Sequence, residues 1–170
     1  MLMGENTKRL GGITIYGDYW DLHNLYDTIA DVLKAPVFTE DDLILNAFLY
    51  DIRHAFQGQR LQHIFYKDDD LRKVEYFGVT ILWPMFIFSV AYIRWGLSFI
   101  DNSKKHQADA YRLEEIAHSL LIKADPSIGL TCIDWLKSFP GFPKDYLVQF
   151  FNECTFRYLS FSDKPKKRFS

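Results

Sequence analysis

Residues 81–100 read ILWPMFIFSVAYIRWGLSFI, and this apolar stretch decides how the rest of the chain is interpreted. It is long enough to cross a bilayer as a helix, and Arg94 is its only strongly polar member. Near the centre of a spanning helix, that arginine would cost about 2.5–3.5 kcal/mol. Pro84 stands where a globular helix would begin, and the segments on both sides are amphipathic. The stretch therefore predicts a buried central helix from Pro84 to about Ile100, with a membrane span as the alternative.

The segments before this helix predict one strand and two helices. Gly12–Gly17 reads GITIYG, which is typical of a short strand. Asp18 can cap a helix from about Tyr19 to Lys34. Apolar residues repeat along this helix with a helical period and predict its core face: Leu22, Leu25, Tyr26, Ile29 and Leu33. Thr39 and Asp42 resemble a capping box for a second helix, which we expect from about Glu40 to Gln57 before Gly58.

A hairpin and three further helices complete the expected order. The β-rich runs Leu61–Lys67 and Arg72–Ile81 are joined by the acidic turn Asp68–Asp70. Capping and breaking residues then predict three helices, which run from Ser103 to about Ala124, from Asp125-Pro126 to about Ser138, and from about Lys144 to Leu159. Their predicted core stripes are Leu113, Ile116, Ala117, Leu120, Leu121 and Ala124 in the first, and Leu147, Phe150, Phe151, Cys154 and Tyr158 in the last. The order β-α-α-β-β-α-α-α-α predicts an α+β fold, mostly helical, with a sheet of about three strands, antiparallel or mixed.

Composition describes an ordinary globular chain. Its 170 residues are 48% hydrophobic and 25% charged, with a net charge of -2. We expect one domain over residues 1–161 and a basic, disordered tail over residues 162–170. The body without that tail is acidic, so we do not expect nucleic acid as a partner. The chain carries 4 Trp, 10 Tyr and 15 Phe, and rings left over from the core would mark a partner or ligand surface.

Cys132 and Cys154 fit no metal or redox spacing. The first residues, MLMGENTKRLGG, contain no apolar run of signal-peptide length. We therefore expect a cytoplasmic protein with both thiols free and no membrane association.

Three stretches resemble a known family. They are GITIYGDYWDLHNLYDTI at residues 12–29, YDIRHAFQGQR at residues 50–60 and ILWP at residues 81–84. They look like a family of small bacterial proteins classed as a domain of unknown function. The resemblance implies a bacterial cytoplasmic protein, and it implies no activity and no catalytic residue.

The predicted second helix carries an unusual polar face. Its members are neither Lys nor Glu, which usually fill solvated helix faces; they are Asn46, Tyr50, Arg53, His54 and Gln57, with Asp51 at the rim and Arg60 just beyond the helix. An ordinary polar face or a structural network is one interpretation. A ligand or partner site is the other, in which Arg53 would bind an anion and His54 would act as donor or base, with Asp51 orienting its ring.

Metal binding and catalysis have weaker signals. Asp51 with His54, Glu115 with His118, and the row His23, Asp27 and Asp31 have spacings that metal ligands can use. Pairs of this kind also arise by chance in a chain with 22 acidic residues and 5 His. On the expected helix, Glu115 and His118 point away from the apolar stripe. No nucleophile elbow and no phosphate loop is present, so we expect no metal, no cofactor and no assigned catalytic residue.

The sequence thus favours a non-catalytic protein-interaction or accessory module that binds a protein partner or a second copy of itself, such as a homodimer. The alternative is a small-molecule binder or enzyme using the Asp51, Arg53 and His54 face.

Overall fold

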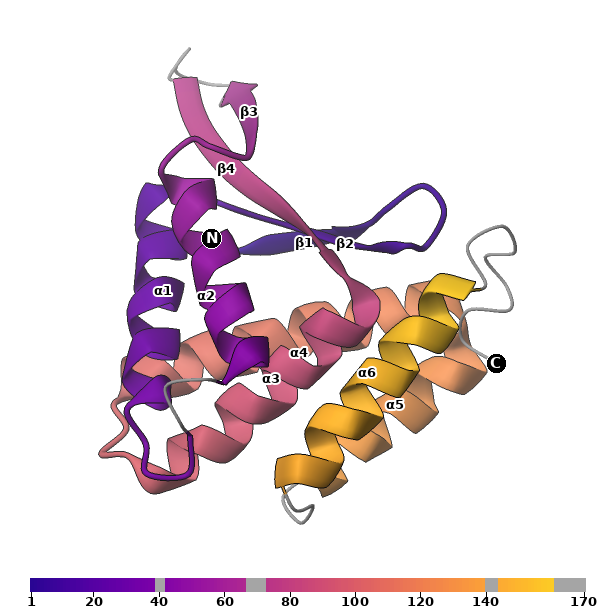
Figure 1. The fold of residues 1–170 in the computed structure, drawn as a ribbon. Helices are drawn as coiled ribbons and strands as arrows, with labels where there is room; N and C mark the ends of the chain where they lie inside the picture. Colours follow the sequence, from indigo (N-terminus) through magenta and orange to yellow (C-terminus); the bar gives the residue numbers. More distant parts are fainter. Residues whose placement is uncertain (39–41, 67–72, 140–143, 161–170) are drawn as a thin grey trace.

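The computed structural model describes residues 1–38, 42–66, 73–139 and 144–160 (Figure 1). These residues form a four-stranded antiparallel sheet, six α-helices and one short 3₁₀ turn, which confirms the α+β class. The helices are α1 (Tyr19–Leu33), α2 (Leu43–Phe56), α3 (Trp83–Gly96), α4 (Lys104–Ala124), α5 (Pro126–Ser138) and α6 (Lys144–Ser160). The strands are β1 (Met3–Asn6), β2 (Gly12–Gly17), β3 (Leu61–Tyr66) and β4 (Lys73–Leu82).

Helix α3 is the centre of the core, as its sequence predicts. It packs against the sheet and against helices from both halves of the chain, and its side chains are buried around most of its circumference. Pro84 lies in its first turn, where a missing N–H leaves no bond unmade. The helix ends at Gly96, and Leu97–Phe99 continues as a 3₁₀ turn, so the expected end near Ile100 is four residues too late. None of the helices in the described ranges could cross a membrane.

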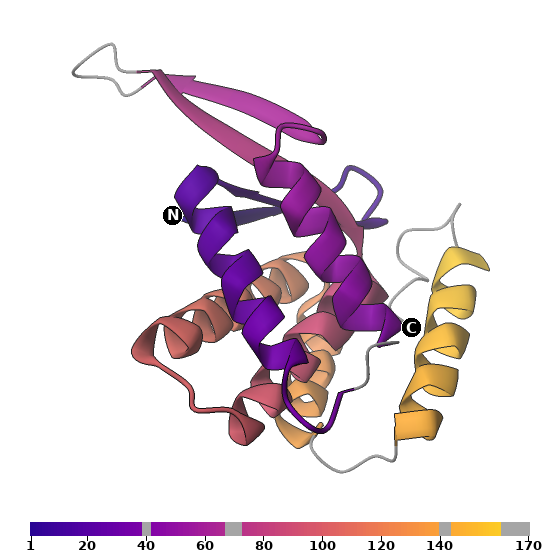
Figure 2. The same ribbon diagram turned by 60° about the vertical axis from the view of Figure 1, so that its left-hand side comes forward.

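The sheet has the strand order β1-β2-β4-β3, with every neighbouring pair antiparallel. It contains one strand more than the sequence predicts, namely β1. This four-residue strand, MGEN, has no β-branched residue, and it forms by pairing with β2 and packing against α4. Residues 73–76 of β4, before Phe77, pair only with β3, and the two strands form a ribbon that projects from the body (Figure 2).

Helices α1 and α2 lie side by side (Figure 2). Asp18 caps α1 through a hydrogen bond from Asp21 N, so the predicted start of this helix is confirmed. The predicted start of α2 is wrong. Asp42 is itself the cap, accepting from Leu45 N, and the helix begins at Leu43; Thr39 and Glu40 lie outside the described residues. Asp68–Asp70 and the predicted tail also lie outside them.

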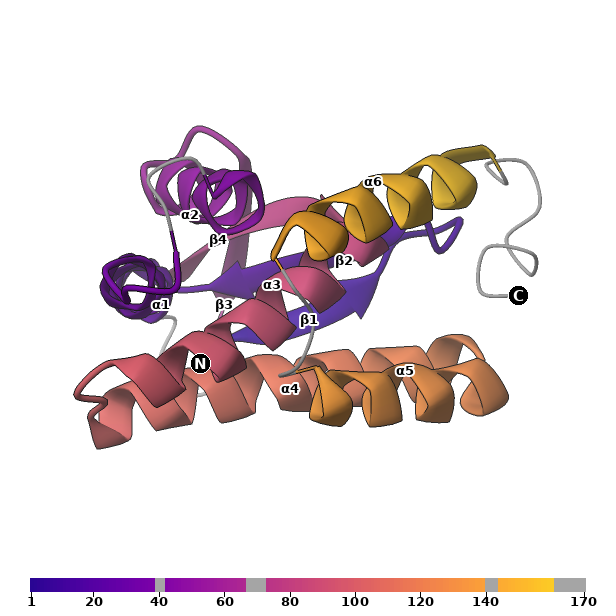
Figure 3. The ribbon, with the colours of Figure 1, turned by 60° about the horizontal axis from the view of Figure 1, so that its bottom comes forward.

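Helix α5 folds back along α4, and α6 packs against α3 (Figure 3). The close approach of α5 depends on Gly129, where a Cβ atom would lie 2.8–2.9 Å from backbone atoms of Leu121 and Ile122. In α6 the predicted core stripe is partly confirmed, because Tyr158 is buried. It is wrong at Phe150, whose side chain is exposed. Leu147, another member of that stripe, has no described side chain.

Candidate functional site

The predicted polar face lies on α2, and Tyr50, Arg53 and His54 of this face form a small group, which we call the Tyr50 cluster. The Tyr50 and His54 rings have centroids 4.0 Å apart, and Arg53 Cζ lies 5.2 Å from the Tyr50 centroid. One turn of helix separates these positions, so the helical repeat alone brings them together. Tyr50 is 51% exposed, whereas Arg53 and His54 are half-buried. The Tyr50 cluster therefore lies at the surface, and its arginine and histidine side chains are partly shielded from water.

Two atoms of the Tyr50 cluster have no hydrogen-bond partner among the described residues. They are Arg53 Nε and His54 Nε2, and both are buried. The other ring nitrogen of the histidine, Nδ1, donates to Gln59 Oε1. Buried polar atoms are normally satisfied by protein or water, so this pair is a place where a ligand, a partner or water can bind.

The remaining residues of the polar face are arranged differently from the expected catalytic geometry. Arg60 Nη2 donates to Asp51 Oδ1 at 3.0 Å, and this exposed ion pair occupies the carboxylate. Asp51 therefore pairs with Arg60, and the His54 ring is oriented by Gln59 instead. Asn46 is half-buried near the start of the face, and Gln57 is exposed at its end.

A second surface, which we call the aromatic patch, adjoins this face. Its rings come from the first turns of α1 and the last turn of α2, and they contact one another at centroid distances of 5.1–6.4 Å. The patch consists of Tyr19, Trp20, His23, Tyr26 and Phe56. Trp20 is 68% exposed and Tyr19 is 40% exposed. The fold therefore brings these rings together, and it leaves Trp20 and Tyr19 exposed above the half-buried rings of His23, Tyr26 and Phe56.

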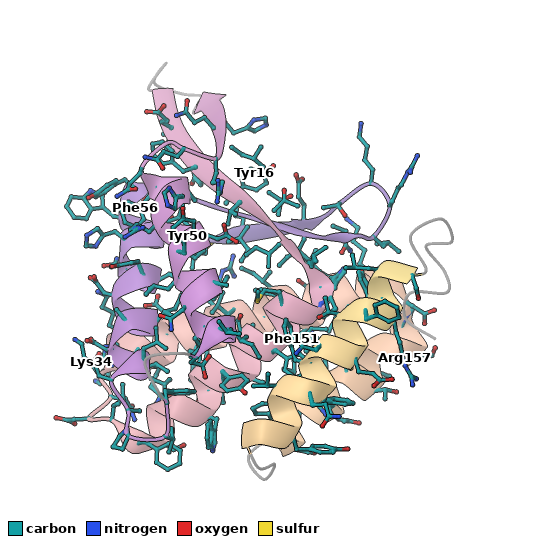
Figure 4. The ribbon with its side chains drawn as sticks, in the orientation of Figure 1. Tyr16, Lys34, Tyr50, Phe56, Phe151 and Arg157 are labelled. Carbon is teal, nitrogen blue, oxygen red and sulfur yellow. The ribbon has the colours of Figure 1, made fainter. Side chains whose placement is uncertain are left out.

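The patch and the polar face are continuous on α2. Phe56 belongs to the patch, and Arg53 lies one turn earlier, about 60° further around the helix. Tyr50 lies about one further turn toward the start of α2. Figure 4 shows Phe56 and Tyr50 on the same helix, with Phe56 toward α1. The combined surface presents tryptophan, tyrosine and arginine side chains, and the Nε atom of that arginine is buried without a partner among the described residues.

The sequence places Tyr26 on the core face of α1, and the half-buried ring does pack against the core; it assigns Trp20 to no site. A signal was nevertheless present. With the α1 core stripe at zero, Trp20 lies about 160° away, on the side that faces solvent. A tryptophan at such a position is an exposed ring by construction, and the helical repeat could have identified it.

The row His23, Asp27 and Asp31, whose spacing could suit metal ligands, forms ion pairs in the structure. His23 Nδ1 and Lys105 Nζ each lie 3.4 Å from Asp27 Oδ2, and His106 Nε2 lies 3.2 Å from Asp31. The His23 contact lies within α1, whereas the Lys105 and His106 contacts join α4 to α1. In the described ranges, no three His, Cys, Asp or Glu side chains are grouped as metal ligands.

Two further pairs of residues have defined surroundings. Glu115 and His118 line a pocket between α3, α4 and α5. Cys132 and Cys154 are free, and burial raises the pKa of both thiols. Neither cysteine has the lowered pKa that a nucleophile needs.

The family model described as Domain of unknown function (DUF6904) matches residues 2–170. The chain belongs to this family, which confirms the resemblance stated above and extends it over the helical second half. No curated protein and no solved structure gave a match.

Proposed function

We propose that this member of the family is a protein-interaction module that binds its partner through the aromatic patch together with Arg53 and Tyr50. The observation that carries the proposal is the exposure of Trp20, at 68%, within a cluster of mutually contacting rings. Clustered apolar side chains at a surface mark interaction sites. Tryptophan, tyrosine and arginine are also the residues that dominate binding energies at protein interfaces.

The chemistry of the surface indicates what the partner must offer. The Trp20 ring requires an apolar pocket that removes it from water. Arg53 forms no ion pair with a described carboxylate, and its Nε atom is buried without a partner. A carboxylate from the partner would pair with the accessible part of the Arg53 guanidinium through a charge-assisted hydrogen bond. The expected partner is therefore a protein surface with an apolar pocket beside an acidic side chain.

A second copy of the chain is one such partner, since two-fold dimers are the commonest oligomers. The proposal retains the expectation of a bacterial cytoplasmic protein, which rests on the resemblance and on two free thiols. It does not require catalysis, because Asp51 and His54 are engaged by Arg60 and Gln59.

The second candidate function is binding of a small molecule at Arg53 and His54 of the Tyr50 cluster. The unpartnered Arg53 Nε and His54 Nε2 atoms favour it. Under this alternative, Arg53→Ala and His54→Ala would abolish turnover or ligand binding, while Trp20→Ala would leave both unchanged. The interaction module predicts the opposite dependence on Trp20.

Co-purification of the tagged chain from its native host, at its native level, tests the proposal. Wild type and Phe156→Ala are expected to retain one stoichiometric protein, or a second copy of the chain, that Trp20→Ala loses. Phe156 on α6 is the matched control, because this ring is 75% exposed and lies outside the patch. Loss of a hot-spot ring costs about 2 kcal/mol or more, or roughly 30-fold in affinity. Equal recovery with Trp20→Ala and Phe156→Ala would contradict the proposal.

A further inference from the structure

Helices α3, α4 and α5 form a pocket of about 900 Å³ at a distance in sequence and structure from the aromatic patch. No residue of the patch or of the α2 polar face lines it. Figure 3 shows α3 lying over the α4–α5 pair. One part of the pocket wall is apolar and is formed by Val90, Ala91, Trp95, Ile133, Leu136 and Phe139. Pockets for small organic molecules have volumes of about 300–1,000 Å³ and mostly apolar walls.

The polar part of the wall contains two arginines and one lysine against two glutamates, together with His118. Arg94 donates more of the hydrogen bonds found in the described residues than either of the other two cations. Its Nε and Nη2 atoms donate to the two oxygens of Glu114, at 2.5 and 2.8 Å, and Nη1 donates to Gln107 Oε1 at 3.0 Å. The Tyr111 ring lies against the same guanidinium, with Cζ 4.3 Å from the centroid. Arg94 and Glu114 thus neutralise each other and join α3 to α4.

The other two cations are less well compensated. Arg112 is half-buried, and both its Nε and its Nη2 donate to the Leu2 carbonyl, at 2.8 and 2.7 Å. Within the described part of the chain, Arg112 forms no ion pair with a carboxylate. Among the described residues, the carboxylate that pairs with Lys137 is that of Asp134, at 3.6 Å, and both side chains are more than 70% exposed. A partly desolvated cation without an acid favours an anion from outside the chain.

We propose that this pocket binds a small organic anion: a carboxylate or sulfonate on an aromatic or branched apolar body. The apolar body would lie against the wall formed by α3 and α5. The anionic group would lie near Arg112 and Lys137 at the rim. This inference is independent of the proposed function, because it concerns different helices and a different class of ligand.

A pair of fluorescent probes separates the two parts of this ligand. 8-Anilino-1-naphthalenesulfonate has the required apolar body and an anionic group, and N-phenyl-1-naphthylamine has nearly the same body without a charge. Titration of each probe into the folded chain is expected to show one site per chain with a clear preference for the sulfonate. Equal affinity for the two probes, or no saturable site, would overturn the proposal.

Two variants locate the site without removing core side chains. Ala108→Trp adds a ring from the exposed rim of α4 into the pocket and is expected to weaken both probes. Lys137→Glu reverses an exposed charge at the rim and is expected to weaken the sulfonate by about fivefold, with little effect on the neutral probe. Lys123→Glu is the matched control, because it reverses an exposed charge on α4 outside the pocket.

Two further results would overturn the proposal. One is unchanged sulfonate binding in Ala108→Trp with a native circular dichroism spectrum. The other is an equal loss of affinity in Lys123→Glu and Lys137→Glu. Trp20→Ala is expected to bind the probes as wild type does; loss of binding in this variant would place the dye on the aromatic patch and would also overturn the pocket assignment. If the probes do not bind in the pocket, the co-purification test of the aromatic patch is unaffected. If co-purification fails, the probe titrations still test the pocket.

Discussion

Replacing Trp20 with alanine is expected to change stability far less than replacing Trp83 with alanine. The two side chains are the same in size and differ in exposure, at 68% for Trp20 and 1% for Trp83. A tryptophan that becomes fully buried removes about 250 Å² from water. Trp20 therefore hides about 80 Å², which is worth at most about 2 kcal/mol at 25 cal/mol per Å². Because the unfolded chain already buries part of that surface, we expect about 1 kcal/mol.

Trp83, in contrast, is almost completely buried. Its ring is packed at the start of α3 against Phe86, with centroids 6.1 Å apart. Replacement of a buried tryptophan by alanine costs about 3–5 kcal/mol. Domains of this size are stable by about 5–15 kcal/mol in total, so this variant can lose most of its stability. If it does not fold, Trp83→Phe is the substitute, with an expected loss between the two values.

Urea unfolding followed by far-ultraviolet circular dichroism measures both changes. Fluorescence is unsuitable because the chain has 4 Trp and each variant removes one of them. The slope of the free energy against urea should be the same in all variants, so that midpoints can be compared. A loss in Trp20→Ala as large as that in the Trp83 variant would refute the reasoning, because the Trp20 ring would then be a structural element and not a free surface.

Three other outcomes follow from specific contacts. Gly12→Ala is expected to lower the free energy of unfolding by about 2–3 kcal/mol, because its Cβ would lie 2.1 Å from the Ile81 carbonyl oxygen across the β2–β4 pair; a midpoint equal to wild type in urea would contradict this. Burial raises the pKa of Asp109, which accepts a hydrogen bond from Thr28 Oγ1 at 2.6 Å. That carboxyl group thus contributes most stability below its unfolded pKa of about 3.9, and the contribution is lost as the pH rises through the raised folded value. Asp109→Asn should gain stability relative to wild type between pH 3 and pH 7, and a constant difference across thermal melts in this range would disprove the assignment. The Cys132 thiol should react with iodoacetamide at pH 7 more slowly than free cysteine, because burial raises its pKa; equal rates by mass spectrometry would exclude a protected thiol.

Local capping chemistry explains which parts of the fold could be predicted. Asp18, Ser103 and Pro126 each satisfy or remove donors at a helix start, and the helices begin at these positions or one residue later. The apolar run around Pro84 likewise predicted a central helix that is buried on most sides. These features depend on residues close together in sequence, so the sequence alone contains their explanation.

The two errors in the fold have different causes. Strand β1 forms because Met3–Asn6 finds β2 on one side and α4 on the other, and nothing in the four residues themselves favours a strand. At α2, the spacing of Thr39 and Asp42 fitted a capping box, whereas Asp42 is the cap. Strand β1 therefore depends on distant elements, whereas the error at α2 concerns a local pattern with two possible cap positions.

The candidate site shows the same division. The helical repeat predicted that Tyr50, Arg53 and His54 share a face, and they do. It could not predict that α1 would bring Trp20 and its neighbouring rings to the edge of that face, because the approach of α1 to α2 depends on their packing over the sheet. The partners of Asp51 and His54 also come from residues after the helix, at Arg60 and Gln59, where the chain turns back.

Site-specific photo-crosslinking in living cells tests the central claim most directly. A benzophenone amino acid is placed at position 20 in one variant and at position 156 in another, which compares two exposed aromatic sites on different faces. The account predicts one dominant protein adduct from position 20, either with another protein or with a second copy of the chain, and its loss when Arg53→Glu is added. Equal adducts from both positions, or no adduct from position 20 in cells that contain the folded chain, would contradict it.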